Sequence, residues 1–112
     1  MSPKELDGYI LKHKGAELSY PFGKELAVYS VNKEMFVISE VGKLPPRLSL
    51  RCDKLLAETL KARYEEVMAP HKLNKDKWIR VVLSGQLTDH EVEGLIDLSY
   101  KLVKSERLSG GA

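Results

Sequence analysis

The strongest local signal in this sequence is a helix start near residue 88 that leads into one long apolar stripe. Thr88 and Glu91 have the spacing of a capping box, and Leu87 and Val92 occupy the positions of a hydrophobic staple. At helical spacing beyond them, one face of the helix is almost wholly apolar: Leu95, Ile96, Ser99, Leu102 and Val103. A stripe of this length must be buried against another layer, so the rest of the chain has to supply a surface for it.

Short segments rich in strand-forming residues can supply that surface. LAVYSV (26–31) and MFVIS (35–39) are separated by NKE, which predicts a hairpin. RLSLR (47–51) alternates strictly, so Leu48 and Leu50 should face the core while its two arginines face a wetter side. VMAP predicts a short strand and WIRVVL, from Trp78, a longer one.

Two further helices are predicted from their start signals. Ser2, Pro3 and Glu5 form a capped start for a helix over about residues 3–14, and Asp53 can cap a second helix that reaches about Tyr64. The segment AELSYPFGKE between the first helix and the first strand is interpreted as a connector. The order helix, three strands, helix, two strands, helix predicts an α+β fold, a two-layer domain with helices packed on an antiparallel sheet.

The length of the chain limits it to one domain. A chain of 112 residues can form one hydrophobic core, so we expect a single domain over residues 1–105 and a flexible polar tail over 106–112. Its apolar runs are far shorter than the ~20 residues of a bilayer span, and no secretory signal is visible. Cys52, the only cysteine, fits a reducing compartment. We therefore expect a cytoplasmic protein without membrane association.

Positive charge is concentrated in one loop and on two strands. A net charge of +2 does not by itself indicate a polyanionic partner, so only the placement of the charge could. The candidate nucleic-acid-binding set contains side chains that could contact successive phosphates: Arg47, Arg51, Lys72, Asn74, Lys75, Lys77 and Arg80. A lysine-rich loop is more often a solvated turn, and Asn74 is suited to stabilising that turn through its own backbone.

Aromatic residues give two open interpretations. Trp78 and Tyr29 are candidate residues for stacking on the bases of a single strand. A lone tryptophan at the start of an apolar strand is more often buried, which is the interpretation we favour for Trp78. The segment YPFG (20–23) could form part of a recognition groove, but a structural turn that holds the first helix to the sheet is the simpler reading.

Few residues suggest catalysis or metal binding. His13, His71 and His90 lack the spacing of a metal site, and we expect neither a metal nor a cofactor. Cys52 precedes a predicted helix start that would favour a thiolate, although an inert, packed cysteine is the more frequent case. The pair Glu65 and Glu66 is interpreted as ordinary surface charge rather than as an acid and base pair.

The order of short motifs resembles the YjbR/MmcQ-like family of small bacterial domains. The resemblance runs from YPFG through MFV, PRLSLRCD, the LNK that precedes Trp78, VVLSG and IDLSYKLV, and covers about Ser19 to Val103. It implies a frataxin-like or secretion-chaperone-like fold in which helices pack on a strongly bent antiparallel sheet. This chain has Lys72 and Lys77 where many relatives carry histidines, so histidine chemistry of the relatives does not transfer.

The family is often described as DNA-binding, and together with the charge placement this suggests a function. The leading hypothesis is a non-enzymatic domain that binds DNA through backbone contacts with low sequence preference. The alternative is a protein-interaction or adaptor domain whose sheet surface or groove receives an acidic or extended peptide. In either case we expect a monomer or a weak homo-oligomer.

Overall fold

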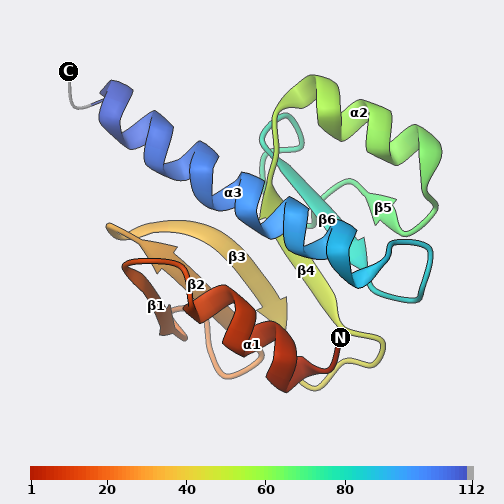
Figure 1. The fold of residues 1–112 in the computed structure, drawn as a ribbon, viewed down its shortest axis with the longest axis horizontal. Coiled ribbons are helices and arrows are strands. Elements are labelled where there is room, and N and C mark those ends of the chain that lie inside the picture. The colour runs from red at the N-terminus through yellow and green to blue at the C-terminus, as the bar shows by residue number, and fades with distance from the viewer. Residues whose placement is uncertain (111–112) are drawn as a thin grey trace.

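The computed structural model describes residues 1–110, with side chains described through Glu106. It is an α+β fold in which three helices lie on a six-stranded antiparallel sheet (Figure 1). The helices are α1 (Pro3–Leu11), α2 (Lys54–Arg63) and α3 (Asp89–Gly110). The strands are β1 (Ala16–Ser19), β2 (Leu26–Val31), β3 (Glu34–Glu40), β4 (Arg47–Arg51), β5 (Val67–Met68) and β6 (Trp78–Val82). The sheet order is β1-β2-β3-β4-β6-β5.

The predicted helix starts are confirmed. At α1 the Ser2 side chain accepts from the Glu5 N–H while the Glu5 carboxylate accepts from the Ser2 N–H, which forms a capping box. At α3, Thr88 and Glu91 make the same reciprocal pair, with 2.9 and 3.1 Å between the bonded atoms. The Asp53 carboxylate caps α2 by accepting from the Leu56 N–H at 2.9 Å.

The strand β1 was not predicted, because we interpreted its residues as part of a connector. Its four residues, Ala16 to Ser19, alternate apolar and polar, but only Ala16 is even partly buried, and alanine and glutamate are poor strand formers, so the segment was not recognised as a strand. It exists because its backbone pairs with β2, with Ala16 opposite Val31 and Ser19 opposite Val28. It is an edge strand, and its polar side chains suit an exposed edge.

Two helix ends also differ from expectation. Helix α1 ends at Leu11 rather than near residue 14. Helix α3 continues to Gly110, past residue 106 where we expected a tail to begin, and residues 111–112 lie outside the described part of the chain. The sequence beyond Val103 is polar, so it carries no apolar stripe to mark a continuing helix.

The hairpin between β2 and β3 is formed as predicted and carries a bulge. Asn32 and Lys33 have φ angles of 52° and 68°, the conformation of a two-residue turn that matches the twist of the strands. The register shifts between Tyr29 and Ser30, which leaves Phe36 without a partner on β2. Phe36 has no exposed surface and is among the largest residues of the core.

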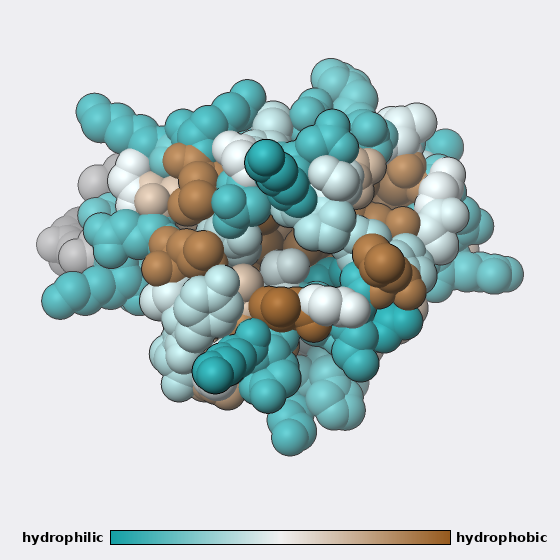
Figure 2. All heavy atoms as spheres, turned by 90° about the horizontal axis from the view of Figure 1, so that it is seen from below, coloured by the Kyte–Doolittle hydropathy of each residue, from teal (hydrophilic) through white to brown (hydrophobic). Residues whose placement is uncertain are grey.

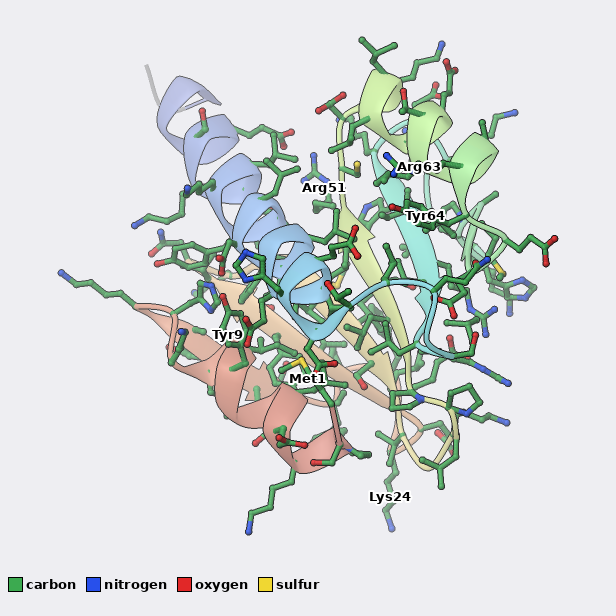
Figure 3. All side chains as sticks on the ribbon, turned by 45° about the vertical axis from the view of Figure 1, so that its right-hand side comes forward. Met1, Tyr9, Lys24, Arg51, Arg63 and Tyr64 are labelled. Atoms are coloured by element: carbon green, nitrogen blue, oxygen red, sulfur yellow. The ribbon has the colours of Figure 1, made fainter. Side chains whose placement is uncertain are left out.

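The main core lies between the helices and one face of the sheet. Helix α3 crosses this face diagonally, with α1 beside the β1–β2 side and α2 near β5 and β6 (Figure 1). The buried residues of the predicted α3 stripe include Val92, Ile96, Ser99 and Val103, which confirms that the sheet covers it. Polar contacts join the two neighbouring helices, since Tyr9 on α1 points toward α3 (Figure 3) and donates to Asp97 at 2.7 Å.

Ser99 fixes the position of α3 on the sheet. β3 and β4 pair through Val37 and Leu50, after which they diverge beneath α3 (Figure 1). The Ser99 hydroxyl accepts from the Arg51 N–H at 2.9 Å and donates to the Phe36 carbonyl at 2.5 Å. The buried hydroxyl therefore bridges the two strands where their ladder opens, and satisfies one backbone group on each.

Substituting Ser99→Ala should destabilise the fold by about 1–3 kcal/mol, because it leaves the Arg51 N–H and the Phe36 carbonyl buried without partners. The free energy of unfolding from urea denaturation measures the effect. The control is Ser105→Ala, an exposed serine on the same helix. Equal stability of the two variants would contradict the bridging role of Ser99.

Candidate binding pocket on the open face of the sheet

The face of the sheet opposite the helices carries a continuous row of side chains. The strand registers align Val28 with Ile38, Ile38 with Ser49, Ser49 with Arg80, and Arg80 with Met68. Residues aligned in this way share one face, because side chains alternate along each strand. The row crosses five strands and places small Ser49 beside the long side chain of Arg80.

A pocket of about 850 Å³ lies over this row. Its walls are largely apolar: Phe22, Leu26, Ile38, Met68, Ala69 and Leu73. Its polar lining consists of Glu40, Ser49, His71, Lys72 and Arg80. The pocket therefore combines a hydrophobic wall with a small number of polar groups, a combination common in sites that bind ligands.

The loop after β5 forms one side of the pocket and is anchored by a second, smaller core. Trp78, Val28 and Ile38 are buried together, and Leu73 packs against them. Lys72, the residue before Leu73, adopts a φ of 63°, a conformation that lysine rarely takes. The packing of Leu73 therefore holds the loop over the sheet, with Lys75 and Lys77 exposed to solvent and Lys72 exposed at the lining of the pocket.

The polar centre of the pocket is a two-pronged ion pair between Arg80 and Glu40. Arg80 donates from Nε to Glu40 Oε2 at 2.8 Å and from Nη2 to Oε1 at 2.9 Å. The pair spans β4, which lies between their two strands. Hydrogen bonds from Arg80 hold the pKa of Glu40 below its ordinary value, despite partial burial, and the positive charges of Arg47 and Lys43 act in the same direction.

Arg47 lies beside this pair with an unsatisfied donor. Its Nε is buried and has no hydrogen-bond partner among the described residues. Its strand position is opposite Val82, on the same face as Ser49, and its charge acts on Glu40. The sequence indicated Arg47 by its charge alone, and its unsatisfied donor is visible only in the fold.

The predicted cationic residues do not form one uninterrupted positive surface. Arg80 pairs with Glu40, and Arg51 donates to Glu106 on α3 at 2.5 Å. Arg51 lies between β4 and α3 (Figure 3), and also donates to the Lys77 carbonyl at 3.2 Å. Carboxylates are thus interspersed among the arginines, because each half-buried guanidinium needs an acceptor.

Asn74 has the structural role that we favoured. Its side-chain oxygen accepts from the Asp76 N–H at 2.8 Å, and its carbonyl accepts from the N–H groups of Lys77 and Trp78.

The candidate stacking residues are both unavailable to bases in this structure. Trp78 is 7% exposed and Tyr29 is 4% exposed, with the Tyr29 hydroxyl donating to Asp7.

Phe22 is a pocket residue that we assigned to a structural turn. It is 58% exposed, and Tyr20, Val41 and Leu44 are also exposed. The loops that carry these residues meet where the Val41 N–H donates to the Glu25 carbonyl at 2.9 Å. The view from below shows hydrophobic groups separated by hydrophilic side chains rather than one continuous apolar area (Figure 2).

The side chains considered for catalysis or metal binding lie in surroundings that give them structural roles. Cys52 is 2% exposed, and burial raises the pKa of its thiol to about 11, so the reactive thiolate is disfavoured. His13 is half-buried between the helices and contacts Asp97 through Nε2 at 2.7 Å. No group of three metal-binding side chains occurs within the described residues. None of the described helices is both long enough and apolar enough to cross a membrane.

Glu66 is buried, so its interpretation as surface charge was wrong. It is 5% exposed and accepts from the Ser84 hydroxyl at 2.5 Å, the Gln86 N–H at 2.8 Å and the Leu87 N–H at 3.3 Å. Burial alone would raise the pKa of Glu66, but these donors outweigh it and lower the pKa. The carboxylate therefore fixes the loop that leads into α3.

Comparisons with known proteins agree with this architecture. A family model described as YjbR matches residues 11–102. The Escherichia coli K12 protein named uncharacterized protein YjbR is 31% identical over 101 residues, covering 90% of this chain and 86% of the relative. Another E. coli protein, from O157:H7 and named uncharacterized protein YbdF, is 26% identical over 87 residues, covering 78% and 71%.

Two solved structures share the fold. Deinococcus radiodurans protein DR2400, described as a DUF419 domain, matches with a TM-score of 0.83 and 26% identity, covering 89% of this chain and 76% of that one. A protein from Pseudomonas syringae matches with a TM-score of 0.76 and 22% identity, covering 91% and 98%. The α+β antiparallel arrangement is therefore common to this chain and these proteins.

Glu66→Gln should lower the free energy of unfolding at neutral pH by about 1–3 kcal/mol, because the buried acceptor loses its charge. The pKa of Glu66 is lowered in the folded state, so the stabilisation is present above the unfolded pKa and is lost as the pH falls through the folded one. Urea unfolding should thus show the two proteins converging in acid. The control is Glu65→Gln, at an exposed neighbour, and a gap independent of pH would contradict the assignment.

Proposed function

The chain belongs to the YjbR family, and from this premise we propose that it is a non-enzymatic binding domain whose sheet-face pocket receives an extended segment of a partner protein. The observation that carries the proposal is the pocket of about 850 Å³ on the sheet face that the helices leave open. Its volume lies in the range of ligand pockets, roughly 300–1,000 Å³.

The composition of the pocket wall supports a polypeptide as the partner. Ile38, Leu26 and Leu73 offer an apolar surface that can cover a large side chain of the partner. Exposed Phe22 extends this surface to the pocket mouth. The polar groups are few and lie beside the apolar wall, which suits a chain that alternates side chains with polar backbone groups.

The state of the polar groups supports binding rather than catalysis. Both carboxylate oxygens of Glu40 accept hydrogen bonds from Arg80, and the lowered pKa keeps this carboxylate ionised. An ionised carboxylate held by a guanidinium is a poor proton donor and a weak base. The only cysteine is likewise buried with a raised pKa. We also propose that the protein is cytoplasmic, because a single free cysteine fits a reducing compartment.

DNA binding is the second candidate, and the lysine loop supports it. Lys72, Lys75 and Lys77 are exposed within six consecutive residues, where each could lie at a phosphate. The arginines contribute little to this surface, because Arg80 and Arg51 are paired with carboxylates. Such binding would be weak, insensitive to sequence and strongly dependent on salt.

Filling the pocket should abolish peptide binding without unfolding the protein. Ala69 lines the pocket and is exposed, so Ala69→Trp can occupy the cavity at little cost to the core. The matched control is Ala62→Trp, at an exposed position on α2. The immobilised wild-type domain is used to select peptides from a random phage-displayed library, and synthetic labelled copies are titrated by fluorescence anisotropy.

We expect the selected peptides to bind the wild type and the Ala62→Trp variant and to lose affinity for Ala69→Trp by at least about tenfold, the cost of excluding one large side chain from its site. Equal thermal stability of the three proteins shows that the loss is local. Failure of the wild type to select any peptide, or equal binding to Ala69→Trp, contradicts the proposed function.

The double substitution Lys72→Glu and Lys75→Glu tests the second candidate. Labelled duplex and single-stranded DNA should bind the wild type at low salt and dissociate as salt rises, because lysine contacts act through counterion release. The double variant should lose this binding with an unchanged melting temperature, since both residues are exposed. The control reverses Lys4 and Lys101, which are exposed on α1 and α3. Absence of binding by the wild type at low salt eliminates DNA as the partner.

A further inference from the structure

We propose that the pocket recognises a carboxylate on its partner segment, placed next to a large apolar side chain, with Arg80 as the residue that binds the carboxylate and Arg47 as a positive charge beside it. This inference rests on the proposed function, because it names the chemistry of the segment that the pocket receives. It is argued from the charge around Glu40, the weakly used donor of Arg80, and the apolar wall beside it.

The charge around the ion pair is predominantly positive. Glu40 is the only carboxylate among the described residues that line the pocket, whereas Arg80 and Lys72 both line it. Arg47 and Lys43 add positive charge close enough to act on Glu40. One carboxylate cannot neutralise this set, so an anionic group in the pocket meets a favourable potential.

Arg47 supplies a donor that the fold leaves unsatisfied. Its Nε is buried and has no partner among the described residues, whereas the Nε atoms of Arg51 and Arg80 both have acceptors. A buried donor without an acceptor is costly, and native structures rarely retain one without a reason. Arg47 does not itself line the pocket, so it acts on an anion there through its charge, as it acts on Glu40.

Arg80 can also bind a second anion without releasing Glu40. Its Nε and Nη2 are used on Glu40, but its Nη1 donates only to the Met68 sulfur, at 3.5 Å. A thioether is a weak acceptor, and a carboxylate oxygen makes a much stronger hydrogen bond with a guanidinium. A ligand carboxylate would therefore take the place of the sulfur and leave the ion pair intact.

The apolar wall determines what accompanies the carboxylate. Ile38 and Leu26 lie beside Glu40 on the lining, and Phe22 borders the same space. A DNA backbone carries the anion but offers no apolar group that would bury these side chains. An acidic residue adjacent to a large apolar residue fits both parts of the pocket, and we infer that chemistry for the partner segment.

The peptides selected by the wild-type domain provide the probe. We expect them to contain Asp or Glu next to a large apolar residue. Synthetic copies in which the acid is replaced by Asn or Gln should bind about tenfold to a hundredfold more weakly, the worth of a charge-assisted hydrogen bond. Selected peptides that bind equally well after this replacement overturn the inference while leaving the proposed function intact.

Arg47→Gln tests the assignment to this residue. It should reduce the affinity ratio between acidic peptide and neutral copy by about tenfold, because it removes a positive charge next to the bound carboxylate. The matched control is Arg63→Gln, an exposed arginine at the end of α2 (Figure 3). An unchanged ratio overturns the role of Arg47, and a general structural loss is recognised because it would weaken both peptides equally. A competition with duplex DNA gives the remaining outcome. If DNA displaces the acidic peptide from the wild type, and the Lys72→Glu and Lys75→Glu double variant abolishes this displacement, the site is a polyanion-binding surface. That result overturns the inference.

Discussion

The hydroxyl of Ser99 determines how this fold divides its two sheet faces. It bridges the backbone of β3 and β4 where their ladder opens, and so fixes the long helix α3 against one face. The apolar stripe of α3 packs on that face, with α1 beside β1 and β2 and α2 near β5 and β6. The other face is covered by no helix and receives the loop after β5, anchored by Leu73 against Trp78, with Phe22 from the loop after β1 at its border. A pocket on the open face is a direct consequence, because one loop cannot cover what helices cover on the other side.

The open face also explains why the arginines behave differently from the lysines. Arg80 and Arg51 lie partly buried against the sheet, and each is paired with a carboxylate that offsets its desolvation. The lysines of the loop remain in solvent, where no partner is needed. Arg47 is the exception, since its buried Nε lacks an acceptor. The molecule thus has a solvated cationic loop beside a recessed polar centre, and Lys72 belongs both to the loop and to the lining of the pocket.

Local signals allowed much of the fold to be predicted from sequence. The caps at Ser2, Asp53 and Thr88, and the alternation in β4, depend on neighbouring residues and are read directly. Strand β1 and the buried carboxylate of Glu66 depend on distant partners, and a sequence pattern carries no record of them. The pocket also depends on residues that are distant in the sequence. Its neighbours Ile38, Ser49 and Arg80 come from three strands, and only the register of the strands aligns them. Two hints were available: the strict alternation in β4, which predicted a second, less apolar face, and the YPFG segment, which was considered for a recognition groove and contains Phe22 of the pocket lining.

Backbone amide resonances of the isotope-labelled domain test the central claim most directly. They are recorded during titration with a peptide that the wild-type domain has selected. The account predicts that the perturbed amides lie at Leu26, Ile38, Ser49, Arg80, Ala69 and residues 71–73, around the lining of the pocket. Perturbations confined to the helices, or to the lysine loop at residues 75–77 with the pocket amides unchanged, would contradict it.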